Sequence, residues 1–398
     1  MEASSASSRS ARSVAVTLLP IMAAVLTGFL VIGIALPVLP LHVNRDLGFG
    51  TFVVGLVAGA QFIASVATRI WSGRYADRCG GKRAVMLGLA AAAGAGLLYL
   101  LAWAAERCPV LSVAILLAGR ALLGGAESFI ITGGVSWGLA QVEGRHAGKV
   151  IAWVGTAMFA ALALGGPVGT MLFASTGFAA IGATTTVLPL FVFLSLLRAP
   201  APHLLARRAK APLRSIFKAV WLPGAGAALS SVGYGAILAF GSLLYSDHGW
   251  QPVWLAFTTF GLALIAARLI CGHLPDRFGG ARIALLFIVV QAAGLLLVGL
   301  ARDGGLASTG AALAGFGYSL VYPGFGVEAV RGSSPETRGL IMGIYTVFLD
   351  VAMAVGSPAL GWIAALGGLN SVFVVSSCVT LSAAALAVRL LQRSQAEL

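Results

Sequence analysis

Long apolar segments dominate this chain and limit what it can fold into. A span of the bilayer needs about 20 apolar residues as a helix, because the hydrocarbon core offers no water to backbone N–H and C=O groups. Only 10% of the residues are charged and 59% are hydrophobic, which is unsuited to a soluble surface. The sequence therefore predicts an all-α integral membrane protein with twelve transmembrane helices. They lie at residues 14–39, 50–72, 84–104, 110–136, 149–173, 179–197, 219–245, 252–272, 283–301, 306–329, 339–364 and 370–391.

A motif of fifteen residues occurs twice in the sequence. Residues 69–83 read RIWSGRYADRCGGKR and residues 268–282 read RLICGHLPDRFGGAR, with seven identities and no gap. Each copy joins two apolar segments, and the repeat divides the chain almost in half. Internal duplication is typical of secondary transporters. We therefore predict two pseudo-symmetric six-helix bundles, residues 1–197 and 219–398, joined by a linker at 198–218.

The basic residues indicate how the chain is oriented. Of the 26 Lys and Arg residues, twenty fall at the termini or on the connections of one side, and only Arg45, Arg107 and Arg302 fall on the other side. The linker has six basic residues and no acidic one. The positive-inside rule therefore places both termini, the linker and both motif copies in the cytoplasm. The net charge of +13 then reflects topology rather than nucleic-acid binding. Because the first apolar segment is too long for the core of a signal peptide, we expect no cleavage.

Three motifs resemble the major facilitator superfamily. The repeated stretch resembles its signature for the loops between helices 2 and 3 and helices 8 and 9. Arg120 and Gly124 resemble its helix 4 motif. Gly166, Pro167 and Gly169 resemble the helix 5 motif of its antiporters, although Leu162 and Thr170 stand where that motif has glycine. The residues that carry the loop signature are Gly73, Asp77, Arg78, Gly80, Arg83, Gly272, Asp276, Arg277, Gly279 and Arg282.

The resemblance extends over essentially the whole chain. Residues 119–169 and 345–350 look most similar to the YhhS/YfcJ-type branch of bacterial exporters. The resemblance implies the major facilitator fold and alternating access around a site near the bilayer midplane. It also implies a conformational lock that joins the loop signature to helix 11 and, by pseudo-symmetry, its second copy to helix 5. Turn formation and orientation are the alternative role of these residues.

Glycine and aspartate give the loop signature a physical logic. Glycines permit a tight turn and close packing of helix ends, and Asp77 and Asp276 are favoured against the N-terminus of a neighbouring helix. Arg69 and Arg268 precede the first glycine of each copy by one turn. We expect these two arginines to reach the membrane surface or to pair with the motif aspartates.

Ionisable residues inside apolar segments are costly in a membrane and mark functional sites. Arg120 and Glu127 are seven residues apart, so two helical turns place them on one face. Asp350 lies within the eleventh segment among apolar neighbours. We predict that Arg120, Glu127 and Asp350 take part in proton coupling; the alternatives are a static ion pair and a carboxylate held by hydrogen bonds. Glu328 is expected to pair with Arg331 instead.

Aromatic residues provide candidates for a substrate pocket. Tyr234, Tyr318, Tyr322 and Tyr345 fall inside apolar segments, where such rings also fill cores and membrane interfaces. His42, near the outer end of the first segment, is either a packed histidine or part of a proton relay.

The best functional hypothesis is export of small organic molecules by proton antiport. A proton-coupled symporter that takes up a sugar or an organic acid is the alternative, and a non-transporting membrane sensor is a remote one. We expect no enzyme, because the chain has no HExxH, P-loop or GxSxG motif, and its four cysteines lack CxxC spacing. The expected partners are a small-molecule substrate, protons and the lipid bilayer, with no cofactor, metal or nucleic acid. A monomer is expected, with multiple spans in the inner membrane of a bacterial cell.

Overall fold

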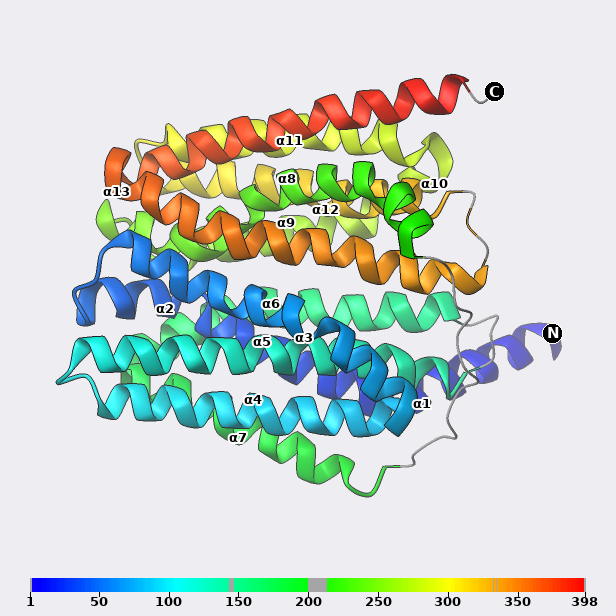
Figure 1. The fold of residues 1–398 in the computed structure, drawn as a ribbon, viewed down its shortest axis with the longest axis horizontal. Coiled ribbons are helices and arrows are strands. Elements are labelled where there is room, and N and C mark those ends of the chain that lie inside the picture. The colour runs from blue at the N-terminus through cyan, green and yellow to red at the C-terminus, as the bar shows by residue number, and fades with distance from the viewer. Residues whose placement is uncertain (1, 143–146, 200–212, 332, 334, 397–398) are drawn as a thin grey trace. The chain divides into compact units, whose positions relative to one another are not determined.

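The computed structural model describes residues 2–142, 147–199, 213–331, 333 and 335–396 (Figure 1). This part of the chain is helical and contains no strand, which confirms the predicted all-α fold. The elements are α1 (Glu2–Ala35), α2 (Val38–Leu41), the π-helix η1 (His42–Asp46), α3 (Thr51–Cys79), α4 (Gly81–Ala104), α5 (Pro109–Leu139), α6 (Ala147–Thr176), α7 (Phe178–Leu196), α8 (Leu213–Asp247), α9 (Leu255–Cys271), α10 (Leu274–Phe278), α11 (Gly280–Gly299), α12 (Gly304–Val330) and α13 (Pro335–Ala396).

The helices account for each of the predicted spans. Among the described residues, nine helical segments are long and apolar enough to cross a membrane. One of them lies in α13, whose 62 residues contain two predicted segments separated at Gly368, which has φ 78°. The predicted spans 252–272 and 306–329 correspond to α9, with 17 residues, and α12, with 27 residues. Gly80, Gly177 and Gly279 also have positive φ and allow the sharp turns between helices.

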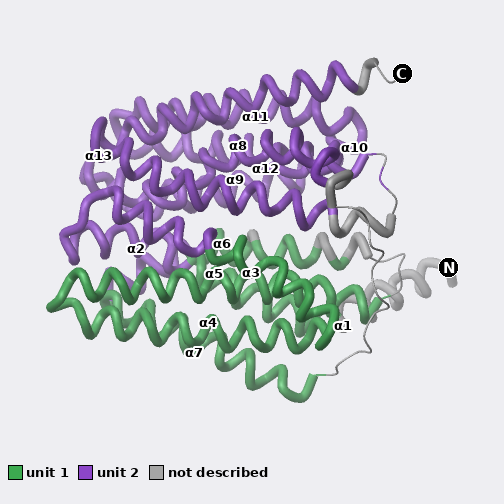
Figure 2. The backbone as a smooth tube through the Cα atoms, viewed as in Figure 1, with its two compact units in different colours: residues 1–33, 64–165, 176–207 green, residues 34–63, 166–175, 208–398 purple. Residues whose placement is uncertain are grey.

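The structure divides into two compact units (Figure 2). Unit 1 consists of residues 1–33, 64–165 and 176–207, and unit 2 of residues 34–63, 166–175 and 208–398. Unit 2 therefore contains the end of α1, α2, η1, the beginning of α3 and part of α6 in addition to α8–α13. The predicted division into halves at 198–218 stays a prediction, and residues 200–212 of that linker lie outside the described residues.

Helix pairs at corresponding places in the two sequence halves pack in the same way. In unit 1, α4 packs on both α5 and α7, and in unit 2, α11 packs on both α12 and α13. A Cβ added at Gly96 would collide with the backbone of α7 at Thr186, and one added at Gly294 would collide with the backbone of α12 at Ala314. Small residues permit this approach of membrane helices. The repeat seen in the sequence thus extends to the packing of its helices.

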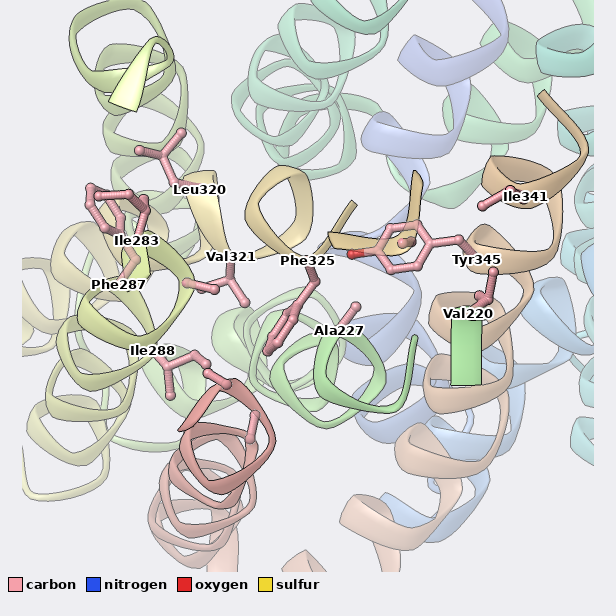
Figure 3. Packing of buried hydrophobic residues seen from close by; sticks show 14 residues of the cluster. Val220, Ala227, Ile283, Phe287, Ile288, Leu320, Val321, Phe325, Ile341 and Tyr345 are labelled. Atoms are coloured by element: carbon pink, nitrogen blue, oxygen red, sulfur yellow. The ribbon is translucent and has the colours of Figure 1, made fainter. Parts of the chain in front are cut away.

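The core of unit 2 lies between α8, α11, α12 and α13. Phe287 of α11, Phe325 of α12 and Tyr345 of α13 belong to one cluster of buried residues. In Figure 3, Phe325 lies beside Ala227 of α8, and Tyr345 extends from α13 with its hydroxyl away from the helix. This packing fixes the inner faces of α12 and α13, from which most of the candidate site comes.

Candidate transport site

The four tyrosines proposed from the sequence all lie in unit 2. Tyr234 of α8 stacks on Tyr318 of α12, with ring centroids 4.9 Å apart and planes 9° from parallel. Tyr234 also stacks on Phe260 of α9, at 5.7 Å. The Tyr318 hydroxyl lies 3.1 Å from the Ser231 hydroxyl, which is one turn before Tyr234 on α8. Three helices thus contribute to one aromatic stack.

Tyr322 and Tyr345 continue this cluster towards α13. Tyr322 follows Tyr318 by four residues, so the two side chains share a face of α12. Its ring lies 4.8 Å from the ring of Tyr345. The Tyr345 hydroxyl donates to the Tyr322 carbonyl oxygen at 2.6 Å, and the hydroxyls of Tyr322 and Thr346 are 3.0 Å apart. Tyr318 and Tyr345 are buried, whereas Tyr234 and Tyr322 are half-buried. We call these four residues the tyrosine cluster.

Two charged side chains of opposite sign lie beside the tyrosine cluster. Arg268 of α9 and Asp350 of α13 both interact electrostatically with the Tyr318 hydroxyl. The Nη2 atom of Arg268 donates to the Ser319 carbonyl oxygen at 3.2 Å. Asp350 is only 2% exposed. The site therefore combines aromatic rings, hydroxyls, a carboxylate and a guanidinium.

Arg268 lies elsewhere than the sequence predicted. We expected this side chain to reach the membrane surface or the motif aspartates, but the structure places it against α12. Its position repeats that of Phe260 and Leu264, which are both buried on α9, at four-residue intervals. This periodicity was the signal in the sequence that Arg268 faces inward.

Arg120 and Glu127 lie on α5 in unit 1. Arg120 is fully buried, and Glu127 is half-buried. The Tyr99 ring packs against Gly119, and Tyr99 interacts electrostatically with Arg120. The pairing of Arg120 with Glu127 and its role in coupling stay predictions. Asp350, the third coupling candidate, belongs to unit 2.

The loop signature forms the expected tight turns. Gly80 and Gly279 have φ of 95° and 90°, and α4 and α11 begin at the next residue. A Cβ at Gly81 would collide with the α5 backbone at Trp137, and one at Gly280 with the α12 backbone at Gly324. Around Gly73, by contrast, the described residues leave open space, so the close packing that we expected there stays a prediction.

The charged residues of the loop signature are exposed at the ends of helices. This holds for Asp77, Arg78, Arg83, Asp276, Arg277 and Arg282. The side chains at positions 334–340, where the predicted lock would meet α13, lie outside the described residues. The lock therefore stays a prediction.

Glu328 contributes an interaction that the sequence analysis missed. Its Oε1 atom accepts from Arg331 Nη2 at 3.0 Å, which confirms the expected ion pair. The same oxygen accepts from the Ala281 backbone N–H at 2.9 Å, in the first turn of α11. A carboxylate at the N-terminus of a helix is favoured by the helix dipole. Glu328 therefore stabilises the beginning of α11, and the expected position of Asp276 at the N-terminus of a neighbouring helix stays a prediction.

The helix 5 motif lies in a tightly packed part of unit 2. A Cβ at Gly166 would collide with the Phe257 ring, and one at Gly169 with the Ile34 carbonyl oxygen. α6 continues through Pro167, and the Thr170 hydroxyl donates to the Gly166 carbonyl oxygen at 3.0 Å. The motif therefore serves close packing, and a role in antiport stays a prediction.

Together these features define a class of protein. Apolar helices in two repeated sets, with ionisable and aromatic residues buried inside them, have the construction of a secondary transporter. In the part of the chain that the structure describes, no group of three or more His, Cys, Asp or Glu side chains is placed to hold a metal ion.

The chain belongs to the Major Facilitator Superfamily, whose model matches residues 21–327 and 226–398. It is 38% identical over 381 residues to an uncharacterized MFS-type transporter of Salmonella typhimurium, covering 96% of this chain and 98% of that protein. A second uncharacterized MFS-type transporter, from Pseudomonas aeruginosa strain UCBPP-PA14, is 38% identical over 369 residues and covers 92% and 91%.

Solved structures of transporters share the fold. The nucleoside transporter NupG superimposes with a TM-score of 0.75 at 14% identity, covering 94% of this chain and 99% of that chain. A D-xylose-proton symporter gives a TM-score of 0.75 at 15% identity, covering 94% and 96%. At such low identity these structures support the fold alone.

Proposed function

We propose that this major facilitator protein exports small organic molecules from the cytoplasm in exchange for protons, by alternating access. The observation that carries the proposal is the position of Asp350. This carboxylate is 2% exposed, lies in a membrane helix and borders the tyrosine cluster.

The cost of burying a charge supports a coupling role for Asp350. A charged carboxylate at the centre of a membrane helix costs about 2.5–3.5 kcal/mol on insertion scales. Binding a proton neutralises the carboxylate and removes that cost. Because Asp350 lies beside groups suited to bind a substrate, proton and substrate occupancy can influence each other there. Arg120 and Glu127 form a second candidate coupling site on α5.

The tyrosine cluster is the proposed substrate contact. Tyrosines combine an apolar ring with a hydroxyl, which suits amphipathic or ring-bearing organic molecules. The half-buried rings of Tyr234 and Tyr322 offer the accessible surface of the cluster.

The direction of transport rests on sequence resemblance. The helix 5 motif at Gly166, Pro167 and Gly169 resembles that of antiporters, and the proposed YhhS/YfcJ-type branch consists of exporters. We place the protein in the inner membrane as a monomer, with both termini and the 198–218 linker in the cytoplasm, as the distribution of basic residues favours.

A screen followed by reconstitution tests export. A deletion strain and an overexpressing strain are compared for toxicity and internal accumulation across a broad set of metabolites and toxic compounds. We expect overexpression to lower the internal level of the substrate. In proteoliposomes, a proton gradient should then drive that compound in the direction opposite to the protons. Accumulation in the same direction as the protons would instead establish the symporter.

Replacing Asp350 tests the coupling site. We expect Asp350→Asn to abolish gradient-driven accumulation while substrate exchange and downhill flux continue, because the amide cannot take up the proton. Asp303→Asn is the matched control, since Asp303 caps α12 by accepting from Leu306 N–H and an asparagine caps equally well. Full accumulation by Asp350→Asn would exclude Asp350 as the coupling site, and Glu127→Gln would then be tested in the same assay.

A further inference from the structure

A short π-helix interrupts the outer end of the first span. η1 follows α2 directly and belongs to unit 2. Its wide turn is closed by the Leu47 N–H, which donates to the His42 carbonyl oxygen five residues earlier at 3.0 Å. The Asn44 side chain donates to the Phe49 carbonyl oxygen at 2.9 Å and holds the following turn. π-Helical turns are rare and are frequently found at functional sites.

A buried histidine and an exposed aspartate are joined within this turn. His42 has no exposed side-chain surface, whereas the Asp46 side chain is 47% exposed. His42 Nδ1 lies 2.8 Å from Asp46 Oδ2. Because a carboxylate only accepts hydrogen bonds, Nδ1 carries the hydrogen, and Nε2 is the atom that takes up a second proton. The pair thus joins a buried imidazole to a solvent-exposed carboxylate.

The same segment is attached to α8 on both sides of His42. Before it, the Pro37 carbonyl oxygen accepts from the Ser242 hydroxyl at 2.7 Å. After it, Arg45 Nη2 donates to the Ser246 carbonyl oxygen. A change in the shape of the η1 turn therefore acts directly on the contact between residues 37–46 and α8.

We infer that His42 and Asp46 form a proton-binding site that controls the contact between residues 37–46 and α8. Protonation of His42 converts its bond to Asp46 into a charge-assisted ion pair, which is stronger than a bond from the neutral ring. The stronger pair holds η1 in its present turn and keeps Arg45 within reach of Ser246. Loss of the proton weakens this hold.

The site responds to the pH outside the cytoplasm, given the topology proposed above. In an export cycle, His42 binds a proton from outside the cell, and the outer face of the protein then closes. The inference about His42 itself holds for either direction of transport. The ordinary pKa of histidine lies near physiological pH.

Few other charges face this site. α3 has no charged residue before Arg69, α9 has none before Arg268, and α13 has none at residues 351–388. The remaining charged or titratable side chains at this end of unit 2 are Arg45, Tyr245, Asp247, His248, Arg302 and Asp303. His248 is itself a histidine, at the end of α8, where its ring packs on Trp250 at 4.5 Å. It provides a matched control.

The test measures a distance as a function of pH. Cys79, Cys108, Cys271 and Cys378 are replaced by serine, and spin labels are attached at Phe52→Cys and Leu300→Cys, two exposed positions of unit 2. Double electron–electron resonance is recorded in proteoliposomes at about pH 5.5 and about pH 8.5, on either side of the ordinary pKa of histidine. We expect two populations in the distribution of distances between the two labels, one short and one long. The ratio of the short to the long population should be about fivefold or more larger at the lower pH.

Variants assign the response to the site. His42→Gln should remove the pH dependence, Asp46→Asn should reduce it, and His248→Gln should leave it unchanged. If His42→Gln does not fold, the pH response of Asp46→Asn decides whether the inference holds, because the Asp46 side chain is half exposed and tolerates replacement more readily. An unchanged pH response in the decisive variant, or no response in the parent protein, overturns the inference. The measurement uses neither substrate nor gradient, so failure of the export hypothesis would not affect it.

Discussion

At the scale of single residues, the hydroxyls of the tyrosine cluster explain why these side chains are stable inside the protein. A buried hydroxyl is costly unless it forms a hydrogen bond. The hydroxyls of Tyr318, Tyr322 and Tyr345 meet the Ser231 hydroxyl, the Thr346 hydroxyl and a backbone carbonyl oxygen. Tyr234, which is half-buried, adds its ring to the stack. Because Tyr234 is half-buried, its replacement should disturb folding less than replacement of the buried Tyr318 or Tyr345.

Replacing Tyr234 tests the cluster as a substrate contact. We expect Tyr234→Leu to weaken apparent substrate affinity about three- to tenfold, since an aromatic pair contributes about 0.5–1.5 kcal/mol. Tyr234→Phe keeps the ring and should retain most of the affinity. The measurement is the concentration dependence of transport, with the melting temperature as a check on folding. Equal KM values for Tyr234→Leu and the parent protein would remove Tyr234 from the substrate site.

At the scale of elements, the loop signature is built from glycines with different roles. Gly80 and Gly279 supply the positive φ that ends one helix and begins the next. Gly81 and Gly280 supply close contact, because their Cα atoms face the backbones of α5 and α12. Gly73 does neither among the described residues. Glycines within one short motif are thus needed for different physical reasons.

Two alanine substitutions separate these roles. Gly81→Ala would collide with the backbone at Trp137, so we expect it to destabilise the protein by about 1–3 kcal/mol, as overpacking does. Gly73→Ala should leave stability unchanged or raise it slightly, because alanine favours a helix over glycine. Melting temperatures of the two purified variants provide the comparison. Equal melting temperatures would contradict the close contact at Gly81.

At the scale of the whole molecule, duplication and charge distribution together predict the topology. The repeat predicts that both loop signatures lie on the same side of the membrane, and the basic residues predict that this side is the cytoplasm. The native cysteines lie in useful places: Cys79 is at the end of α3, and Cys108 is exposed just before α5.

Thiol labelling tests this topology without added cysteines. We expect a membrane-impermeant maleimide to label Cys108 in intact spheroplasts and to leave Cys79 unlabelled, because their loops lie on opposite sides. Cys108→Ser should remove this labelling. Inside-out vesicles should protect Cys108. Labelling of Cys79 from the outside would reverse the predicted orientation.

The properties that depend on local sequence were predictable. Segment length and hydropathy determine whether a stretch crosses a membrane, and each predicted span is a helix in the structure. The repeat and its motifs led to the correct family. The Glu328–Arg331 ion pair was also predictable, since two residues three apart on a helix are neighbours.

Contacts between helices were decided by the tertiary structure. Nothing in the spacing of Tyr234, Tyr318 and Tyr345 shows that they come together, because they lie on three helices whose mutual positions depend on packing. The second partner of Glu328, the Ala281 N–H, and the partner of Arg268, the Ser319 carbonyl oxygen, have the same origin. Spacing along one helix is set by its 3.6-residue period. Distances between helices are set by which small residues allow two backbones to approach, and only the folded chain determines that.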